Sequence, residues 1–169
     1  MPWRFAKPHS HTNKVAYAQV TVNGADITRL PSEDRHLGIL FQDDLLFPHL
    51  SVGQNLEFAL PQSIRPRQNR RDSVKNALAD AGLDGFEDRD PATLSEGQRA
   101  RVAVIRVLLS NPKALLLDEP FSKLDIAMRQ RFREFVFEHL WERKLPTLMV
   151  THDPADAEAA GGKVIQLHS

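Results

Sequence analysis

The chain has 169 residues, enough for one compact domain, and its 41% apolar and 26% charged residues are typical of a globular protein rather than a disordered one. Its 22 basic and 22 acidic residues leave no net charge, so the basic excess of a nucleic-acid-binding protein is missing and no nucleic-acid partner is expected. The absence of cysteine excludes disulfides, thiolate zinc sites and a cysteine nucleophile, and no apolar run is long enough to insert into a membrane.

The first elements in chain order are a tail and a turning strand. Residues 1–14 are polar, are broken by prolines and show no periodicity, so we expect an unmatched N-terminal tail without a signal peptide. His9 and His11 could bind a metal, although a solvated tail is the simpler interpretation. Apolar and polar residues then alternate over 15–22, which predicts a strand that turns at Asn23-Gly24.

The middle of the chain is predicted to be one short strand followed by helices. The strand spans 37–41, and helices follow over 51–60, roughly 73–83, and 95–109. In the last of these, Ser95 and Gln98 have the spacing of a capping box, so this helix is expected to begin at Ser95. Apolar residues recur along one face of the same helix, namely Val102, Ile105, Leu108 and Leu109.

The last third of the chain alternates between strands and helices. Residues 114–117 and 147–150 are short, continuously apolar runs, which is typical of strands buried on both faces of a parallel sheet. A helix is predicted between them over 126–141, and a shorter helix over 153–160 precedes a last strand over 164–167. This order indicates an α/β fold with a mainly parallel core sheet.

Polar side chains follow three of the predicted strands. Gln42 comes after the first strand, Asp118 and Glu119 after the second, and His152 after the third. Ligands of α/β sheets bind at such carboxyl ends, where an aspartate can hold Mg²⁺, a glutamate can polarise water and a histidine can bond a phosphoryl group. The helix beginning at Ser95 adds an anion site through its free N–H groups. Taken singly, each residue could equally be a polar strand end or an ordinary cap.

Together these segments resemble the motifs of ATP-binding cassette (ABC) ATPases of the importer type. The resemblance covers about Tyr17 to Leu167 and includes five motifs in family order. They are Phe41-Gln42-Asp43 (Q-loop, followed by an importer-like Leu46 to Val52), Leu94-Ser95-Glu96-Gly97-Gln98 (signature), Leu115 to Pro120 (Walker B), Ser122-Lys123-Leu124-Asp125 (D-loop) and Thr151-His152-Asp153 (switch histidine). The resemblance implies an incomplete P-loop NTPase-like nucleotide-binding domain over 15–169, with a helical signature subdomain over about 51–110.

The resemblance also implies ATP and Mg²⁺ as cofactors and a role for each motif residue. Asp118 would bind Mg²⁺, Glu119 would be the general base, His152 would contact the γ-phosphate, and Gln42 would touch the metal or the attacking water. Ser95, Gly97 and Gln98 would grip the γ-phosphate of ATP held by a facing subunit, and Asp125 would help to join the two sites.

The implied partners are a second ABC ATPase subunit and a transmembrane permease. The permease would bind the segment from Asp43 to Val52, which would place the protein in the cytoplasm, peripherally on the inner face of the cell membrane. The implied function is to couple ATP binding and hydrolysis to small-solute transport. The transported solute is chosen by the permease and the binding protein.

One family motif is missing, because no G-x-x-x-x-G-K-[ST] string occurs in the 169 residues. P-loop N–H groups and lysine normally cradle the phosphates, so we expect this chain to hydrolyse little ATP alone, either as a truncated gene product or because its start is misassigned. Glu96 replaces a usual glycine of the signature, and its carboxylate would either repel phosphate or face solvent. The alternatives are a non-enzymatic remnant or interaction module of an ABC ATPase, and an unrelated metal-dependent phosphohydrolase using Asp118, Glu119 and His152.

Overall fold

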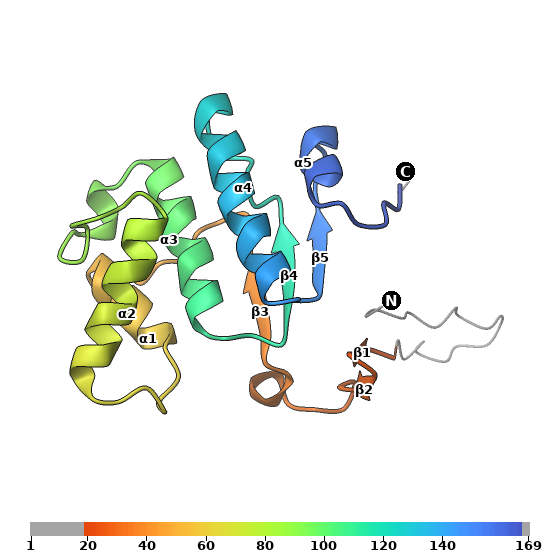
Figure 1. Cartoon of the computed structure of the whole chain (residues 1–169), viewed down its shortest axis with the longest axis horizontal. Coiled ribbons are helices and arrows are strands. Elements are labelled where there is room, and N and C mark those ends of the chain that lie inside the picture. Colours follow the sequence, from red (N-terminus) through yellow and green to blue (C-terminus); the bar gives the residue numbers. More distant parts are fainter. Residues whose placement is uncertain (1–18, 167–169) are drawn as a thin grey trace, which may run out of the picture.

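A computed structural model of the protein describes residues 19–166, with a parallel sheet at its centre and helices packed on one side of it (Figure 1). Three parallel strands form the sheet in the order β3 (Leu37–Leu40), β4 (Ala114–Asp118) and β5 (Thr147–Val150). Gly38 pairs with Leu115, and Leu115 pairs with Thr147. The expected parallel sheet is therefore confirmed, and its neighbouring strands are joined by helical crossovers.

A small antiparallel hairpin precedes the sheet. It consists of β1 (Thr21–Val22) and β2 (Ala25–Asp26), joined at Asn23 and Gly24, whose φ angles are 50° and 82°. Positive φ at both central residues is what a tight turn of the I′ type requires, and Asn-Gly is its preferred sequence. The predicted turn is confirmed, while residues 15–18 of the predicted strand lie outside the described residues.

Two helices cover one face of the sheet, α3 (Glu96–Leu109) and α4 (Ile126–Glu142). The largest fully buried side chain, Phe121, packs edge-on against Phe132 and Phe137 from α4. The same core receives alternate residues of the strands, since successive side chains of a strand point to opposite faces. Its buried members include Leu40, Ala103, Val104, Leu108, Leu115, Leu117, Phe121, Phe132 and Val136.

The opposite face of the sheet is partly exposed. Ile39, Leu148 and Val150 point to it and are 43%, 37% and 55% exposed. The prediction of strands buried on both faces is therefore met best by β4, which is largely buried, and is wrong for β5. The physical reason is that β5 pairs with one neighbour only in the described part of the chain, and its outer side chains lack a packing layer there.

A second helical core lies on the far side of α3. It contains α1 (Val52–Ala59) and α2 (Arg67–Asp80) and buries apolar residues of all three helices. The first of these helices was predicted correctly, but α2 begins six residues before the expected start at 73. Its first turns are polar and exposed, so they carry no apolar periodicity, and Pro66 ends the preceding loop where the helix begins.

The remaining elements are short. Two 3-10 turns, η1 (Ser32–Arg35) and η2 (Pro91–Thr93), were not predicted, and α5 (Pro154–Ala159) follows β5 as expected. The predicted last strand over 164–167 is wrong for its first three residues, because Val164 and Ile165 are 60% and 70% exposed and pair with no strand. Within residues 19–166 no helix is both long and apolar enough to cross a membrane.

Candidate functional site

The polar residues predicted at the strand ends lie along one edge of the sheet. Asp118 is the last residue of β4, and Gln42 and His152 follow β3 and β5. Because the strands are parallel, their carboxyl ends meet at the same edge. The Glu119 amide extends the pairing by donating to the Val150 carbonyl at 2.9 Å. A small depression beside it is lined by Gln42, Asp44, Glu119, Ser122 and Lys123, among others.

Glu119 and His152 form the most direct contact of the site. One carboxylate oxygen of Glu119 accepts hydrogen bonds from the His152 backbone N–H at 3.0 Å and from its ring Nδ1 at 2.8 Å. The Glu119 side chain is 19% exposed, whereas that of His152 is 81% exposed. The hydrogen bond and the charge of Glu119 raise the pKa of His152 above its ordinary value of 6.5. The pair thus joins an anchored carboxylate to an accessible imidazole.

The backbone of Glu119 is held in an unusual conformation. Its φ angle is +48°, in the left-handed region that few non-glycine residues adopt. The Ser122 hydroxyl donates to the Glu119 carbonyl at 2.9 Å and fixes the turn that follows β4. Five other non-glycine residues of the described chain also have a positive φ, so Glu119 is distinguished by its contacts and not by this angle.

The oxygen donors at the strand ends fit only part of a magnesium site. Asp118 and Gln42 are exposed and offer one carboxylate and one amide oxygen. No group of three or more His, Asp or Glu side chains in the described residues is arranged to hold a metal. Mg²⁺ takes few protein ligands and completes its shell with water and substrate phosphates, so two donors are compatible with such a site. No phosphate-cradling string is present in the chain to complete it.

The signature segment forms the N-terminus of α3 as predicted. The Ser95 hydroxyl accepts from the Gln98 amide at 3.2 Å, and the Gln98 side chain accepts from the Ser95 amide at 2.9 Å, which completes the capping box. Gly97 lies against Leu124, since a Cβ there would approach the Leu124 side chain to 3.1 Å. Glu96 is exposed in the first turn, where a carboxylate favours the helix dipole.

The signature residues and the strand-end residues are not in direct contact. Among the described residues no hydrogen bond or ion pair joins Ser95 or Gln98 to Gln42, Glu119 or His152. Asp125 also lies apart from them and caps α4, accepting from the Met128 amide at 2.9 Å. The predicted residues therefore form two groups. The strand-end group consists of Gln42, Asp118, Glu119 and His152, and the signature group of Ser95, Gly97 and Gln98; Asp125 belongs to neither.

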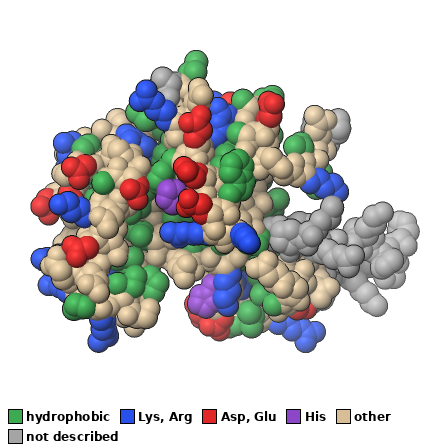
Figure 2. Space-filling model, viewed as in Figure 1, with side chains coloured by type: hydrophobic (Ala, Val, Ile, Leu, Met, Phe, Trp, Pro, Cys, Tyr) green, Lys and Arg blue, Asp and Glu red, His purple; other side chains and the backbone are tan. Residues whose placement is uncertain are grey.

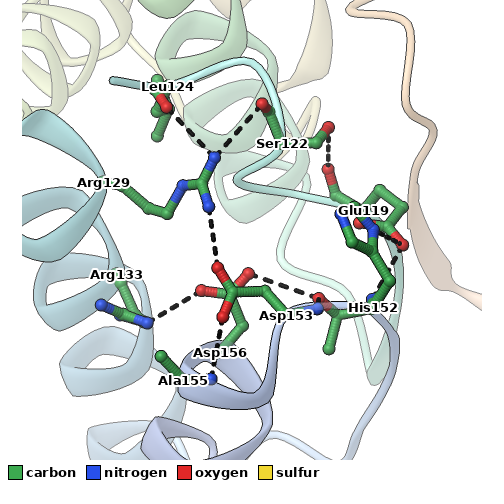
Figure 3. A network of polar contacts seen from close by, with 10 residues as sticks. Glu119, Ser122, Leu124, Arg129, Arg133, His152, Asp153, Ala155 and Asp156 are labelled. Atoms are coloured by element: carbon green, nitrogen blue, oxygen red, sulfur yellow. Dashed lines mark hydrogen bonds and ion pairs between the residues drawn. The ribbon is translucent and has the colours of Figure 1, made fainter. Parts of the chain in front are cut away.

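Sequence reasoning missed the arginines that hold the site together. Arg99 pairs with Asp44 at 3.0 Å, and Arg106 donates to the Leu45 carbonyl at 2.9 Å. These two contacts from α3 hold the segment that follows Gln42 in place. On the other side Arg129 pairs with Asp153 at 2.8 Å (Figure 3). These partners are 24 to 61 residues apart in the sequence, so no local sequence pattern could predict the contacts.

The surface charge agrees with the balanced composition. On the face shown in Figure 2, lysines and arginines are interspersed with aspartates and glutamates, and no continuous basic patch is visible. A nucleic-acid interface would need such a patch. The view therefore gives no support to nucleic-acid binding on this face.

Comparison with known proteins identifies relatives along most of the chain. The chain is 52% identical over 141 residues to the uncharacterized ABC transporter ATP-binding protein YnjD of Escherichia coli K12, covering 83% of this chain and 64% of that protein. It is 40% identical over 149 residues to the sulfate/thiosulfate import ATP-binding protein CysA of Mycobacterium tuberculosis H37Rv (88% and 42%). It is 42% identical over 138 residues to the thiamine import ATP-binding protein ThiQ of Brucella suis biovar 1 (82% and 57%). The chain thus spans between 42% and 64% of the length of these relatives.

Solved structures and a family sequence model give the same assignment. The dimeric structure of the ATP-binding cassette MJ0796 bound to ADP and Pi superposes with a TM-score of 0.76 at 27% identity, covering 85% of this chain and 66% of that chain. The fold is therefore that of an ABC cassette, as the resemblance implied. The sequence model described as "ABC transporter" matches residues 10–122, more than half of the chain. The chain belongs to the ABC transporter family, with importer ATP-binding proteins among its relatives.

Proposed function

We propose that this chain is an ATP-binding subunit of an ABC importer that works beside a second ABC ATPase subunit and serves small-solute transport. The observation that carries the proposal is the contact between Glu119 and His152 at the strand ends, next to Gln42. The same chain also has an intact capping box at the start of its signature helix. An unrelated phosphohydrolase would need the first feature but not the second.

In this proposal the strand-end group prepares water for attack on a phosphate. Glu119 would accept a proton from water, and its bond to His152 fixes the direction of the carboxylate. The exposed His152 ring would donate to a phosphoryl oxygen. Asp118 and Gln42 would hold Mg²⁺, which, when bound, neutralises charge on the transferred phosphate.

The signature group would act on ATP held by the facing subunit. The N-terminus of α3 presents free N–H groups and the positive end of the helix dipole, and Ser95 and Gln98 are exposed or half-buried there. Because the 169 residues include no P-loop string, we propose that this chain alone hydrolyses little ATP and contributes mainly its signature group to a mixed pair. If the chain hydrolyses no ATP at all, it would act only as a non-enzymatic partner of a complete cassette.

A permease would bind beside the segment that follows Gln42. Leu45 and Phe58 are 56% and 70% exposed there, and the Phe58 ring packs edge-on against Phe47 at 5.1 Å. Exposed aromatic and aliphatic side chains that lie together, here on the loop at Leu45 and on α1 at Phe58, are typical of protein interfaces. Through this surface the chain would lie on the inner face of the cell membrane without entering it.

The test is ATP-dependent pairing with a complete cassette. The chain is mixed with the E. coli relative described above, in the presence of Mg²⁺ and ATP, and the mixture is separated by size. We expect a mixed dimer only with nucleotide, and we expect Ser95→Ala to weaken it while Ser73→Ala, at a half-buried position whose hydroxyl bonds the Asn69 carbonyl within α2, does not. ATP turnover by the pure chain at the rate of a complete cassette, abolished by Glu119→Gln, would show a self-sufficient ATPase instead. No pairing under any condition would contradict the proposal.

A further inference from the structure

Arg129 is the residue of α4 that contacts both loops of the strand-end group. Its guanidinium pairs with the Asp153 carboxylate at 2.8 Å, and its other terminal nitrogen donates to the carbonyls of Leu124 at 3.2 Å and Ser122 at 3.4 Å. The side chains of Arg129 and Asp153 are only 25% and 26% exposed, so water screens this pair less than a surface pair. Figure 3 shows Arg129 between the two loops.

The contacts of Arg129 close a ring that contains the candidate catalytic pair. Ser122, one of its carbonyl partners, bonds the Glu119 backbone, and Asp153, its carboxylate partner, is adjacent to His152. Glu119 and His152 complete the ring through their own hydrogen bonds. The ring therefore joins the turn after β4 to the turn after β5 by a path that does not use the sheet.

We propose that Arg129 is a positioning residue that holds the His152 loop against Glu119 and ties it to the loop leading to Asp125. This inference rests on the proposed function, with Asp125 in the role that the family resemblance gives it, at the junction with the second subunit. When that subunit binds against the loop, a shift of the loop would move the Arg129 side chain and thereby change the geometry of the Glu119–His152 pair. A planar guanidinium is suited to this task, because it donates to three oxygens in fixed directions, whereas a lysine offers a single rotating point charge.

The charge of Arg129 and its positioning role have opposite effects on His152. A nearby cation disfavours the imidazolium, so loss of the positive charge alone would raise the pKa of His152. Loss of positioning would weaken the hydrogen bond with Glu119, the largest cause of the raised pKa, and would lower the pKa toward 6.5. The sign of the change therefore separates the two roles.

The experiment is an NMR titration of His152 in the intact chain, with Arg129→Gln and Arg129→Lys and without nucleotide. We expect the pKa of His152 to fall in both variants and the His152 amide signal to shift upfield as its bond to Glu119 loosens. Arg131→Gln, an exposed change on the same helix, should leave both signals unchanged. Should Arg129→Gln fail to fold, Arg129→Lys carries the same expectation, because it keeps the positive charge and loses the planar contacts; Asp153→Asn would not serve, since loss of the Asp153 charge alone lowers the pKa of His152.

A folded Arg129 variant whose His152 pKa stays at the wild-type value or rises would overturn the inference. A similar fall in Arg131→Gln would overturn it too, because the effect would then be nonspecific. The titration needs no ATP and no partner subunit. Failure of the ATP-dependent pairing would therefore count against the proposed function and leave this result standing, while failure of the titration would do the reverse.

Discussion

One carboxylate oxygen of Glu119 accepts both the backbone N–H and the ring N–H of His152, at 3.0 and 2.8 Å. The first bond fixes the loop and the second fixes the imidazole, so the orientation of one residue depends on the other. His152 comes from the strand at the edge of the sheet and Glu119 from the central one, 33 residues earlier. The sheet thus supplies the approximate placement, and this pair supplies the final geometry.

The Glu119–His152 pair predicts a pH-dependent stability. Because the pKa of His152 is raised in the folded state, its protonation stabilises the fold fully below the unfolded value of about 6.5, and this contribution is lost as the pH rises through the folded pKa. Glu119→Gln should remove it. We expect melting temperatures of the wild type and the variant to differ below pH 6.5 and to converge at higher pH.

The control for this comparison is Glu138→Gln, which removes the same charge from an exposed position on α4 without contacting His152. Its difference from the wild type should not change in the same pH window. A Glu119→Gln difference that grows as the pH rises would contradict the assignment.

Asn55 predicts a stability cost in the segment that follows the Q-loop. The side chain is fully buried, accepts from the Phe47 amide at 2.8 Å, and donates to the carbonyls of Phe47, Leu50 and Ser51 at 3.0 to 3.1 Å. Asn55→Leu would remove the bonds of the Phe47 amide and the Leu50 carbonyl, whereas the Phe47 and Ser51 carbonyls keep backbone partners, and we expect a cost of about 2–3 kcal/mol. Chemical denaturation should show this loss, whereas Asn69→Ala, which removes an exposed side-chain bond to the Arg65 carbonyl, should change stability by less than about 0.5 kcal/mol. Equal losses in both variants would count against a special role of Asn55.

Gly38 predicts that the sheet tolerates no side chain where α3 crosses β3. A Cβ at this position would lie 2.4 Å from Leu115 Cδ2 and 2.6 Å from Val107 Cγ1. Overpacking of this kind costs about 1–3 kcal/mol, so Gly38→Ala should lower the free energy of unfolding by that amount. Gly162→Ala, whose Cβ would make only an ordinary contact with the Ala160 carbonyl oxygen at 4.0 Å, should be close to neutral. A neutral Gly38→Ala would mean that α3 is free to move away from the sheet.

The sequence predicts most of the fold because each local signal here agrees with the final packing. Ser95 and Gln98 mark the start of α3, which begins at Glu96 with Ser95 as its N-cap, and Asn23-Gly24 marks the hairpin, since caps and tight turns depend on a few neighbouring residues. The early start of α2 was missed because its first turns are held by polar contacts with the segment before the helix rather than by an apolar stripe. There, Arg70 donates to carbonyls at the end of α1.

The candidate site divides in the same way. Gln42, Asp118, Glu119 and His152 could be placed at one sheet edge from strand order alone. The ion pairs of Arg99 and Arg129 could not be predicted, because each joins loops or helices that meet only in the folded chain. The role of each site residue in the reaction stays a prediction.

Because one face of the sheet is partly exposed, we predict that polar substitutions on it change the free energy of unfolding very little. Val150 is 55% exposed on this face, whereas Leu117, on the neighbouring strand, is 3% exposed on the helix-covered face. Val150→Thr keeps a β-branched side chain suited to a strand, so the free energy of unfolding should change by less than about 0.5 kcal/mol. It should also reduce binding of a hydrophobic dye and self-association at high concentration, because it interrupts an apolar patch. Leu117→Thr is the matched control and should cost about 2–4 kcal/mol through a cavity and a buried hydroxyl. A large loss in Val150→Thr, measured by chemical denaturation, would mean that this face is covered in solution and that the cover contributes to the stability of the fold.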